Sequence, residues 1–107
     1  MSAFTDTVER LAATVAARKG ADPSASYTAQ LLADPARAAK KLGEEAVETA
    51  LAAVQGDRDA LASESADLIY HWLVLLAACG VDLDAVAQKL AAREGRSGLE
   101  EKAARKP

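Results

Sequence analysis

The chain has 107 residues, which suits one domain and is too short for two of ordinary size. Half of the residues are hydrophobic, but 27 of them are alanine, so large apolar side chains are few and the predicted core is thin. With 13 basic and 16 acidic residues the net charge is −3, which disfavours a broad nucleic-acid surface and is compatible with a small phosphorylated ligand. A domain so small gains stability by burying surface against a second copy, so we expect a homodimer.

The composition predicts an all-α protein, because aromatic residues make up only 4% of the chain and β-branched residues are few beside Ala, Leu, Glu, Lys and Arg. The single cysteine, Cys79, excludes an internal disulfide, and no secretion signal opens the chain. The most apolar stretch, residues 68–79, is shorter than the roughly 18 residues of a membrane span and contains His71. We therefore expect a cytoplasmic protein with no nucleic-acid and no membrane partner.

The first predicted helix covers about residues 5–19. Asp6 followed by Glu9 fits a capping box at its start, and Gly20 is a typical signal for its end. A loop rich in Pro and Ser follows, and residues 27–33 have the pattern of a short helix.

A second, longer helix is predicted from Pro35 to about Gln55. Asp34 before Pro35 is an N-cap followed by proline at the first helical position. An apolar stripe at helical spacing is expected to face the core. It consists of Ala39, Leu42, Ala46, Val47, Ala50, Leu51 and Val54.

A tight connection at Gly56 leads into a third long helix that ends before Gly80, and Asp82 is expected to cap a last helix. Short loops between long helices predict antiparallel neighbours, so the expected architecture is an antiparallel helical bundle completed by homodimerisation. We predict one helical domain over residues 1–94 and a flexible tail over residues 95–107, which are rich in Gly, Lys, Arg and Glu.

Two of the predicted helices carry closely spaced carboxylates. These are Glu44, Glu45 and Glu48 on the second long helix and Glu64 and Asp67 on the third. Residues three or four apart share a helix face, and in a hairpin the residues equally far from the turn lie level with one another. Glu48 is level with Glu64 by this count. Glu45 is level with Asp67, so four acids are expected to converge.

Four carboxylates at one place repel one another unless a cation lies among them. Ligands that are all oxygen atoms suit Mg²⁺ or Mn²⁺, and Mg²⁺ usually completes its shell with water and phosphate. The spacing therefore points to a metal site for phosphate chemistry, with Glu45, Glu48, Glu64 and Asp67 as ligands. A solvated helix face with Lys or Arg partners is the alternative, and spacing alone leaves both open.

Two lysines precede these acids by one turn. Lys40 and Lys41 could receive phosphate oxygens, but spacing alone favours i,i+4 pairs of Lys40 with Glu44 and of Lys41 with Glu45. His71 lies one turn after Asp67 and could contact a substrate. A packed, hydrogen-bonded core histidine is the more common alternative.

Three strings of the sequence resemble one known family. They are Ser26-Tyr27-Thr28-Ala29 with Leu31, residues 40–48 (KKLGEEAVE) and residues 64–71 (ESADLIYH). They are similar to the phosphoribosyl-ATP pyrophosphatases of histidine biosynthesis, which belong with MazG-type enzymes and dimeric dUTPases to the all-α nucleotide pyrophosphohydrolases. The resemblance covers about residues 11–93, and its motifs are specific in combination.

The resemblance implies a homodimer that uses Mg²⁺ to hydrolyse the α,β-phosphoanhydride of N1-(5-phosphoribosyl)-ATP, giving phosphoribosyl-AMP and pyrophosphate. It implies that Glu45, Glu48, Glu64 and Asp67 bind the metal, with Glu44 as a further ligand or as the base that orients water. Six residues in family-like segments are candidates for substrate contact. They are Arg18, Tyr27, Thr28, Lys40, Lys41 and His71.

Two other functions stay open from the sequence. One is a pyrophosphohydrolase of the same superfamily that removes other nucleotides, such as dUTP or noncanonical triphosphates. The other is a helical dimerisation module without catalysis, whose acids only keep its surface soluble.

Overall fold

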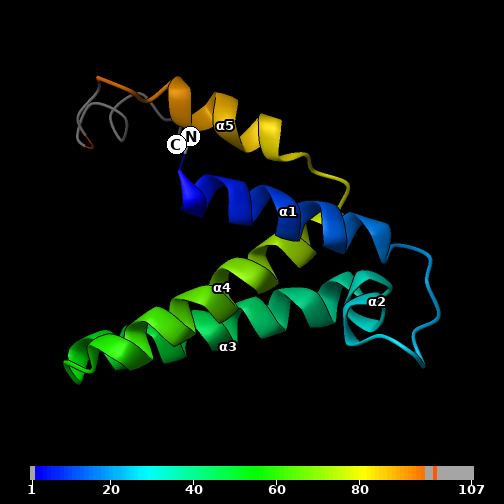
Figure 1. Ribbon diagram of the computed structural model, residues 1–107, viewed down its shortest axis with the longest axis horizontal. Helices are drawn as coiled ribbons and strands as arrows, with labels where there is room; N and C mark the ends of the chain where they lie inside the picture. Colours follow the sequence, from blue (N-terminus) through cyan, green and yellow to red (C-terminus); the bar gives the residue numbers. More distant parts are fainter. Residues whose placement is uncertain (1, 96–97, 99–107) are drawn as a thin grey trace, which may run out of the picture.

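The computed structural model describes residues 2–95 and residue 98. Within them the chain forms five helices and no strand, which confirms the predicted all-α class (Figure 1). The helices are α1 (Ala3–Ala17), α2 (Tyr27–Leu32), α3 (Pro35–Val54), α4 (Arg58–Ala78) and α5 (Leu83–Ala91). Apart from residues 95 and 98, the predicted flexible tail lies outside the described residues and stays a prediction.

Helix α1 begins earlier than the sequence predicted. The Ser2 hydroxyl accepts a hydrogen bond from the Thr5 backbone N–H at 3.1 Å, so Ser2 is the N-cap. Asp6, expected to cap the helix, lies in its first turn, where a negative charge is favourable beside the helix N-terminus. Ser and Asp are both good N-caps, so the sequence could not decide between them.

Ser26, Asp34 and Asp57 cap the next three helices. Each side chain accepts a hydrogen bond from the backbone N–H three residues on, at 3.1, 3.2 and 2.9 Å respectively. Asp34 stands directly before Pro35 as predicted, because proline at the first helical position needs no hydrogen-bond acceptor. The boundaries of α2, α3 and α4 therefore lie within one or two residues of the predicted ones.

The turn between α3 and α4 reverses the chain at Gly56. Its φ of +74° lies in the left-handed region, which glycine adopts without the cost that a β-carbon brings. The Gly56 N–H donates to the Ala53 carbonyl at 3.1 Å and the Asp57 N–H donates to the Ala52 carbonyl at 3.3 Å, which satisfies the last carbonyl groups of α3. As a result α3 and α4 form the predicted antiparallel pair (Figure 1).

The core lies where α1 and α2 meet the C-terminal half of α4 and the start of α3. Its buried members are Val15, Leu31, Leu32, Ala38 and Val74. The half of the hairpin that ends in the α3–α4 turn extends beyond this core, as the free end of the green helices shows in Figure 1. Few hydrophobic side chains are thus buried within one chain, as the alanine content predicted.

The predicted core stripe of α3 is wrong for the single chain. The side chains of Val47, Leu51 and Val54 are 59%, 53% and 85% exposed. The residues of α3 that are buried are Ala38, Glu45 and Ala52. Helical periodicity identifies an apolar face but does not say whether it packs against the same chain or lies open, and here the face toward α4 is lined by small and acidic residues.

Helix α5 follows α4 through a sharp bend and contains no buried residue. It lies on the side of α1 away from α3 (Figure 1). Among the described residues no single helix is long and apolar enough to cross a membrane. Only α4 and α5 taken together pass such a test of length and composition, and the angle between them is 110°.

Candidate functional site

Three carboxylates meet between α3 and α4. Glu45, Glu48 and Glu64 each place one carboxylate oxygen within 4.8 Å of the others. The Thr49 hydroxyl lies between the two helices and donates toward the Glu45 carbonyl at 2.7 Å and the Glu64 carbonyl at 3.2 Å. This shared hydrogen bond joins the helices in the register that brings Glu48 and Glu64 level, as the count from the turn predicted.

Asp67, the fourth acid of the predicted quartet, is outside this group of three. Its side chain is exposed, yet its charge helps to raise the pKa of both Glu45 and Glu64, so it lies close enough to interact with the cluster. The count from the turn places residues on the same level but does not fix where each side chain points. Its role as a ligand therefore stays a prediction.

Two carboxylates of the cluster, those of Glu45 and Glu64, have raised pKa values. Glu45 is 9% exposed, and burial is the main cause that raises its pKa, followed by the hydrogen bond and the charge of Glu48. Burial also raises the pKa of Glu64, again with Glu48 as the next cause. The Glu45 Oε2 atom is buried and has no hydrogen-bond partner among the described residues. A divalent cation would remove this repulsion, and a donor set made of carboxylate oxygens fits Mg²⁺ or Mn²⁺.

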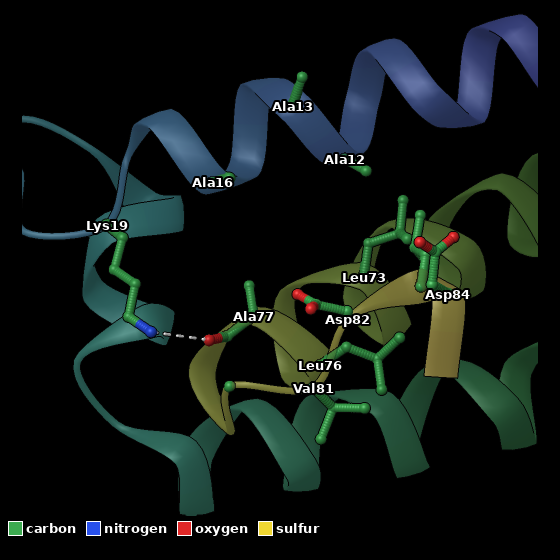
Figure 2. A pocket seen from close by; sticks show the side chains of 12 residues that line it. Ala12, Ala13, Ala16, Lys19, Leu73, Leu76, Ala77, Val81, Asp82 and Asp84 are labelled. Carbon is green, nitrogen blue, oxygen red and sulfur yellow. Dashed lines mark hydrogen bonds between the residues drawn. The ribbon is translucent and has the colours of Figure 1, made fainter. Parts of the chain in front are cut away.

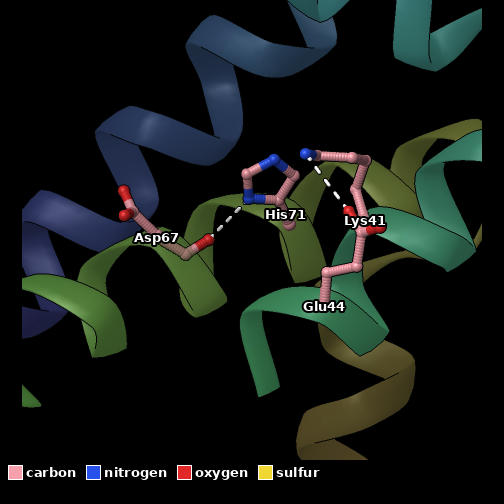
Figure 3. A network of polar contacts seen from close by, with 4 residues as sticks. All are labelled: Lys41, Glu44, Asp67 and His71. Carbon is pink, nitrogen blue, oxygen red and sulfur yellow. Dashed lines mark hydrogen bonds and ion pairs between the residues drawn. The ribbon is translucent and has the colours of Figure 1, made fainter. Parts of the chain in front are cut away.

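His71 is the single histidine of the chain, and it is 7% exposed. Its Nδ1 lies 2.8 Å from the Asp67 carbonyl oxygen (Figure 3), and because a carbonyl can only accept, Nδ1 carries a proton. The buried Nε2 atom has no partner among the described residues, and the charge of His71 lowers the pKa of Glu45. His71 is thus packed and hydrogen-bonded, as in the alternative that the sequence left open beside substrate contact, and it lies at the border of the acidic cluster.

Two tyrosine rings pack edge-on against His71. The ring centroids of Tyr70 and Tyr27 lie 4.9 and 6.3 Å from that of the imidazole. The hydroxyl groups of Thr28 and Tyr70 share a short hydrogen bond, which fixes α2 against α4. Tyr27 is 43% exposed, so one part of its ring supports His71 and another faces outward.

Arg37 completes this group, and the sequence analysis missed it. Its guanidinium carbon lies 5.8 Å from the centroid of the Tyr27 ring, a cation–π arrangement, and its Nη1 donates to Gln30 Oε1 at 3.3 Å. The signal that could have found it is its position one turn before Lys40 and Lys41 on the same helix.

Lys41 forms an ion pair with Glu44 at 3.3 Å (Figure 3), three residues on, rather than with Glu45 as spacing alone suggested. The hydrogen bond with Glu44 is the first cause that raises the pKa of Lys41, and Tyr27 adds to it. Lys40 is exposed, and Arg18 is the C-cap residue of α1. Within the described part of the chain, neither forms a hydrogen bond or ion pair with the acidic cluster.

Two cavities stand out among the described residues, and the smaller of them adjoins the acids. A cavity of about 410 Å³ is lined by Glu48, Glu64 and Leu51 among others. A larger one, of about 510 Å³, lies between α1 and the junction of α4 with α5 (Figure 2). Figure 2 shows it lined mostly by alanine and leucine, with the Lys19 ammonium directed to the Ala77 carbonyl at 3.2 Å. Because the carboxylates gather beside the smaller cavity, we place the candidate site there.

The fold and the site together define an all-α protein whose two longest helices carry a carboxylate cluster suited to a divalent cation. A family model described as "Phosphoribosyl-ATP pyrophosphohydrolase" matches residues 8–94. The chain is 72% identical over 102 residues to a protein named "Phosphoribosyl-ATP pyrophosphatase" from Caulobacter vibrioides (strain NA1000 / CB15N), with 95% of each chain covered. It is 59% identical over 108 residues to a protein of the same name from Methylobacterium radiotolerans, covering 100% of this chain and 99% of the relative. The chain therefore belongs to the phosphoribosyl-ATP pyrophosphohydrolase family and is a hydrolase.

Proposed function

We propose that this protein hydrolyses N1-(5-phosphoribosyl)-ATP to phosphoribosyl-AMP and pyrophosphate with Mg²⁺, as the second step of histidine biosynthesis in the cytoplasm. The observation that carries the proposal is the meeting of Glu45, Glu48 and Glu64 within 4.8 Å in a chain of this family. The names of its relatives support the substrate.

In this proposal the carboxylates that would hold Mg²⁺ are those of Glu45, Glu48, Glu64 and Asp67. The bound ion would neutralise phosphate oxygens and make water more acidic. Glu44 is either a further ligand or the base that orients water, and its ion pair with Lys41 leaves its carboxylate 46% exposed at the edge of the cluster.

On the substrate side, Lys41 interacts electrostatically with Glu45 of the cluster, and its raised pKa keeps it protonated. Lys41 can exchange Glu44 for a phosphate oxygen because the pair is partly exposed and so is weakly held. Tyr27 packs edge-on against His71 at the border of the cluster, and Thr28 is joined to Tyr70, which packs against the same imidazole. Tyr27, Thr28, His71, Lys40 and Arg18 are the further candidates for substrate contact in this proposal.

The function is tested with purified protein, phosphoribosyl-ATP and Mg²⁺. Pyrophosphate release is expected from the wild type, and a loss of at least about a hundredfold in kcat is expected from Glu48→Gln and Glu64→Gln, since each removes a charged ligand. Glu9→Gln, an exposed carboxylate of α1, is the matched control and should retain activity. Full turnover by both site variants would contradict the mechanism.

Two further measurements separate the alternatives. Turnover of dUTP or noncanonical triphosphates comparable with that of phosphoribosyl-ATP would indicate a nucleotide-clearing enzyme instead. A melting temperature that does not rise with Mg²⁺ would indicate a module without catalysis, because a ligand that binds the folded state stabilises it. Complementation of a histidine auxotroph that lacks this step tests the role in the cell.

We further infer that a second copy of the chain covers the exposed apolar face of α3. Val47, Leu51 and Val54 follow one another at spacings of four and three residues, so they share one side of the helix. Exposed apolar side chains gathered in this way are typical of an interface, and a homodimer would bury them. No nucleic-acid or membrane partner is included in the proposal.

A further inference from the structure

The charges of α3 are divided along its length. Between Asp34 and Glu44 the helix carries three cations and no acid, and from Glu44 to Glu48 it carries three acids and no cation. Lys40 and Lys41 follow Arg37 by three and four positions, a spacing at which like charges on a helix repel one another. We call these three residues the cationic segment. Only Lys41 among them forms an ion pair with a side chain of the described residues.

Arg37 is positioned by contacts with Tyr27 and Gln30. Its guanidinium lies over the Tyr27 ring at 5.8 Å, and Gln30 Oε1 at 3.3 Å takes one of its five N–H groups. Asp34, the acid nearest to Arg37 in the sequence, accepts a hydrogen bond from the backbone N–H of Arg37, and no ion pair joins it to the guanidinium among the described residues. The remaining N–H groups form a planar fork that matches two oxygens of a phosphate.

The cationic segment is also near enough to the acidic cluster for one ligand to reach both. Tyr27 contacts Arg37 and His71 and helps to raise the pKa of Lys41, so it connects the segment with the border of the cluster. Arg37 precedes Glu45 by eight positions, a rise of about 12 Å along an α-helix. The substrate of the proposed function carries phosphate at two places separated by a purine and two ribose rings, a span of the same order.

We propose that the cationic segment, with Arg37 as its specificity-determining residue, binds the monophosphate at the end of the phosphoribosyl arm while the triphosphate lies at the acidic cluster. This inference rests on the proposed function. The monophosphate is the group that an ordinary nucleoside triphosphate lacks, so the segment selects phosphoribosyl-ATP over ATP by charge-assisted hydrogen bonds.

Steady-state kinetics of Arg37→Gln test the proposal. The KM for phosphoribosyl-ATP should rise roughly ten- to hundredfold, because a hydrogen bond to a charged group is lost, while kcat changes less than about twofold. If the wild type hydrolyses ATP slowly, Arg37→Gln should hydrolyse ATP at the same rate. The KM of Arg37→Lys should lie between those of the wild type and Arg37→Gln, since lysine keeps the charge but lacks the planar guanidinium fork. Arg10→Gln, which removes an exposed guanidinium of α1, is the matched control and should behave as wild type.

Calorimetry with the product separates this inference from the proposed function. Phosphoribosyl-AMP carries the monophosphate of the phosphoribosyl arm and AMP does not. Arg37→Gln should therefore weaken the binding of phosphoribosyl-AMP about tenfold or more and leave the binding of AMP unchanged. An equal effect on both ligands, or no effect on either, would overturn the inference even if the wild type is fully active. A wild type that binds phosphoribosyl-AMP through Arg37 but does not hydrolyse phosphoribosyl-ATP would refute the proposed function alone.

Discussion

Glu45 is a residue of the candidate site that lowers the stability of the metal-free folded protein. Its carboxylate is buried, one oxygen lacks a hydrogen-bond partner, and Glu48 lies beside it with the same charge. A buried carboxylate in such surroundings costs free energy when it ionises, unless a cation compensates it. The metal-free protein therefore carries an electrostatic cost that the proposed ion would remove.

This cost predicts how the stability of the metal-free protein depends on pH. The folded-state pKa values of Glu45 and Glu64 are raised above the ordinary value of 4.5, so above that pH the folded state holds more protons than the unfolded state. The free energy of unfolding must then fall as the pH rises from 4.5 through the raised pKa values. Urea unfolding in the presence of a chelator, at a series of pH values, measures this slope.

Glu45→Gln gives the matched test, because glutamine keeps the shape and cannot ionise. We expect the free energy of unfolding of the variant to fall less steeply with pH than that of the wild type. At neutral pH without metal, its melting temperature should be a few degrees higher than that of the wild type. Glu9→Gln on the exposed surface of α1 should leave the slope unchanged. A metal-free wild type that becomes more stable over the same pH window would contradict the assignment.

At the scale of the helices, the sequence predicted positions along the chain well and positions around each helix poorly. The start of α3 at Pro35 and the turn at Gly56 follow from local chemistry, namely a cap, a proline and a glycine, which act within a few residues. The inward face of α3 depends on which partner it meets, and that is not local. The same division holds for the site: the level of Glu48 with Glu64 was predictable, whereas the direction of Asp67 and the contact of Arg37 with Tyr27 depend on packing between helices.

The turn between α3 and α4 gives a prediction at this scale. Gly56 has a φ of +74°, and a β-carbon built on it meets no atom within 4 Å, so Gly56→Ala tests the backbone conformation alone. A β-carbon in this region costs about 1–2 kcal/mol, so the free energy of unfolding should fall by that order. Gly43→Ala is the control with the opposite sign, because Gly43 lies inside α3 and also has open space around it. Alanine there should stabilise the protein by about 0.5–1 kcal/mol.

Urea unfolding of both variants decides the outcome. If Gly56→Ala raised the free energy of unfolding as much as Gly43→Ala does, the turn would tolerate a side chain. The hairpin register would then need another cause, such as the hydrogen bonds of Thr49 to both helices.

At the scale of the whole molecule, the open face of α3 and the acidic cluster are connected. The cavity beside the acids is lined by Glu48 and Glu64 and also by Leu51, which belongs to the exposed apolar face. A second copy that packs on this face would therefore form a wall of that cavity. A second copy would therefore have two effects at once. It would add apolar burial to the thin core of the single chain, and it would close the open side of the proposed site.

This connection predicts that Leu51→Glu separates the dimer. Small homodimers are usually related by a two-fold axis, so a residue at the interface faces the same patch of its partner and one substitution introduces two charges into one apolar contact. We expect the wild type to have the mass of a dimer in light scattering and Leu51→Glu to have the mass of one chain. Phe4→Glu is the control, because Phe4 is 66% exposed but lies at the start of α1. A monomeric wild type, or a dimer that survives Leu51→Glu, would show that this face of α3 has another role. Since Leu51 also lines the cavity beside the acids, the monomeric variant should lose activity in parallel with the dimer when both are measured over the same range of protein concentration.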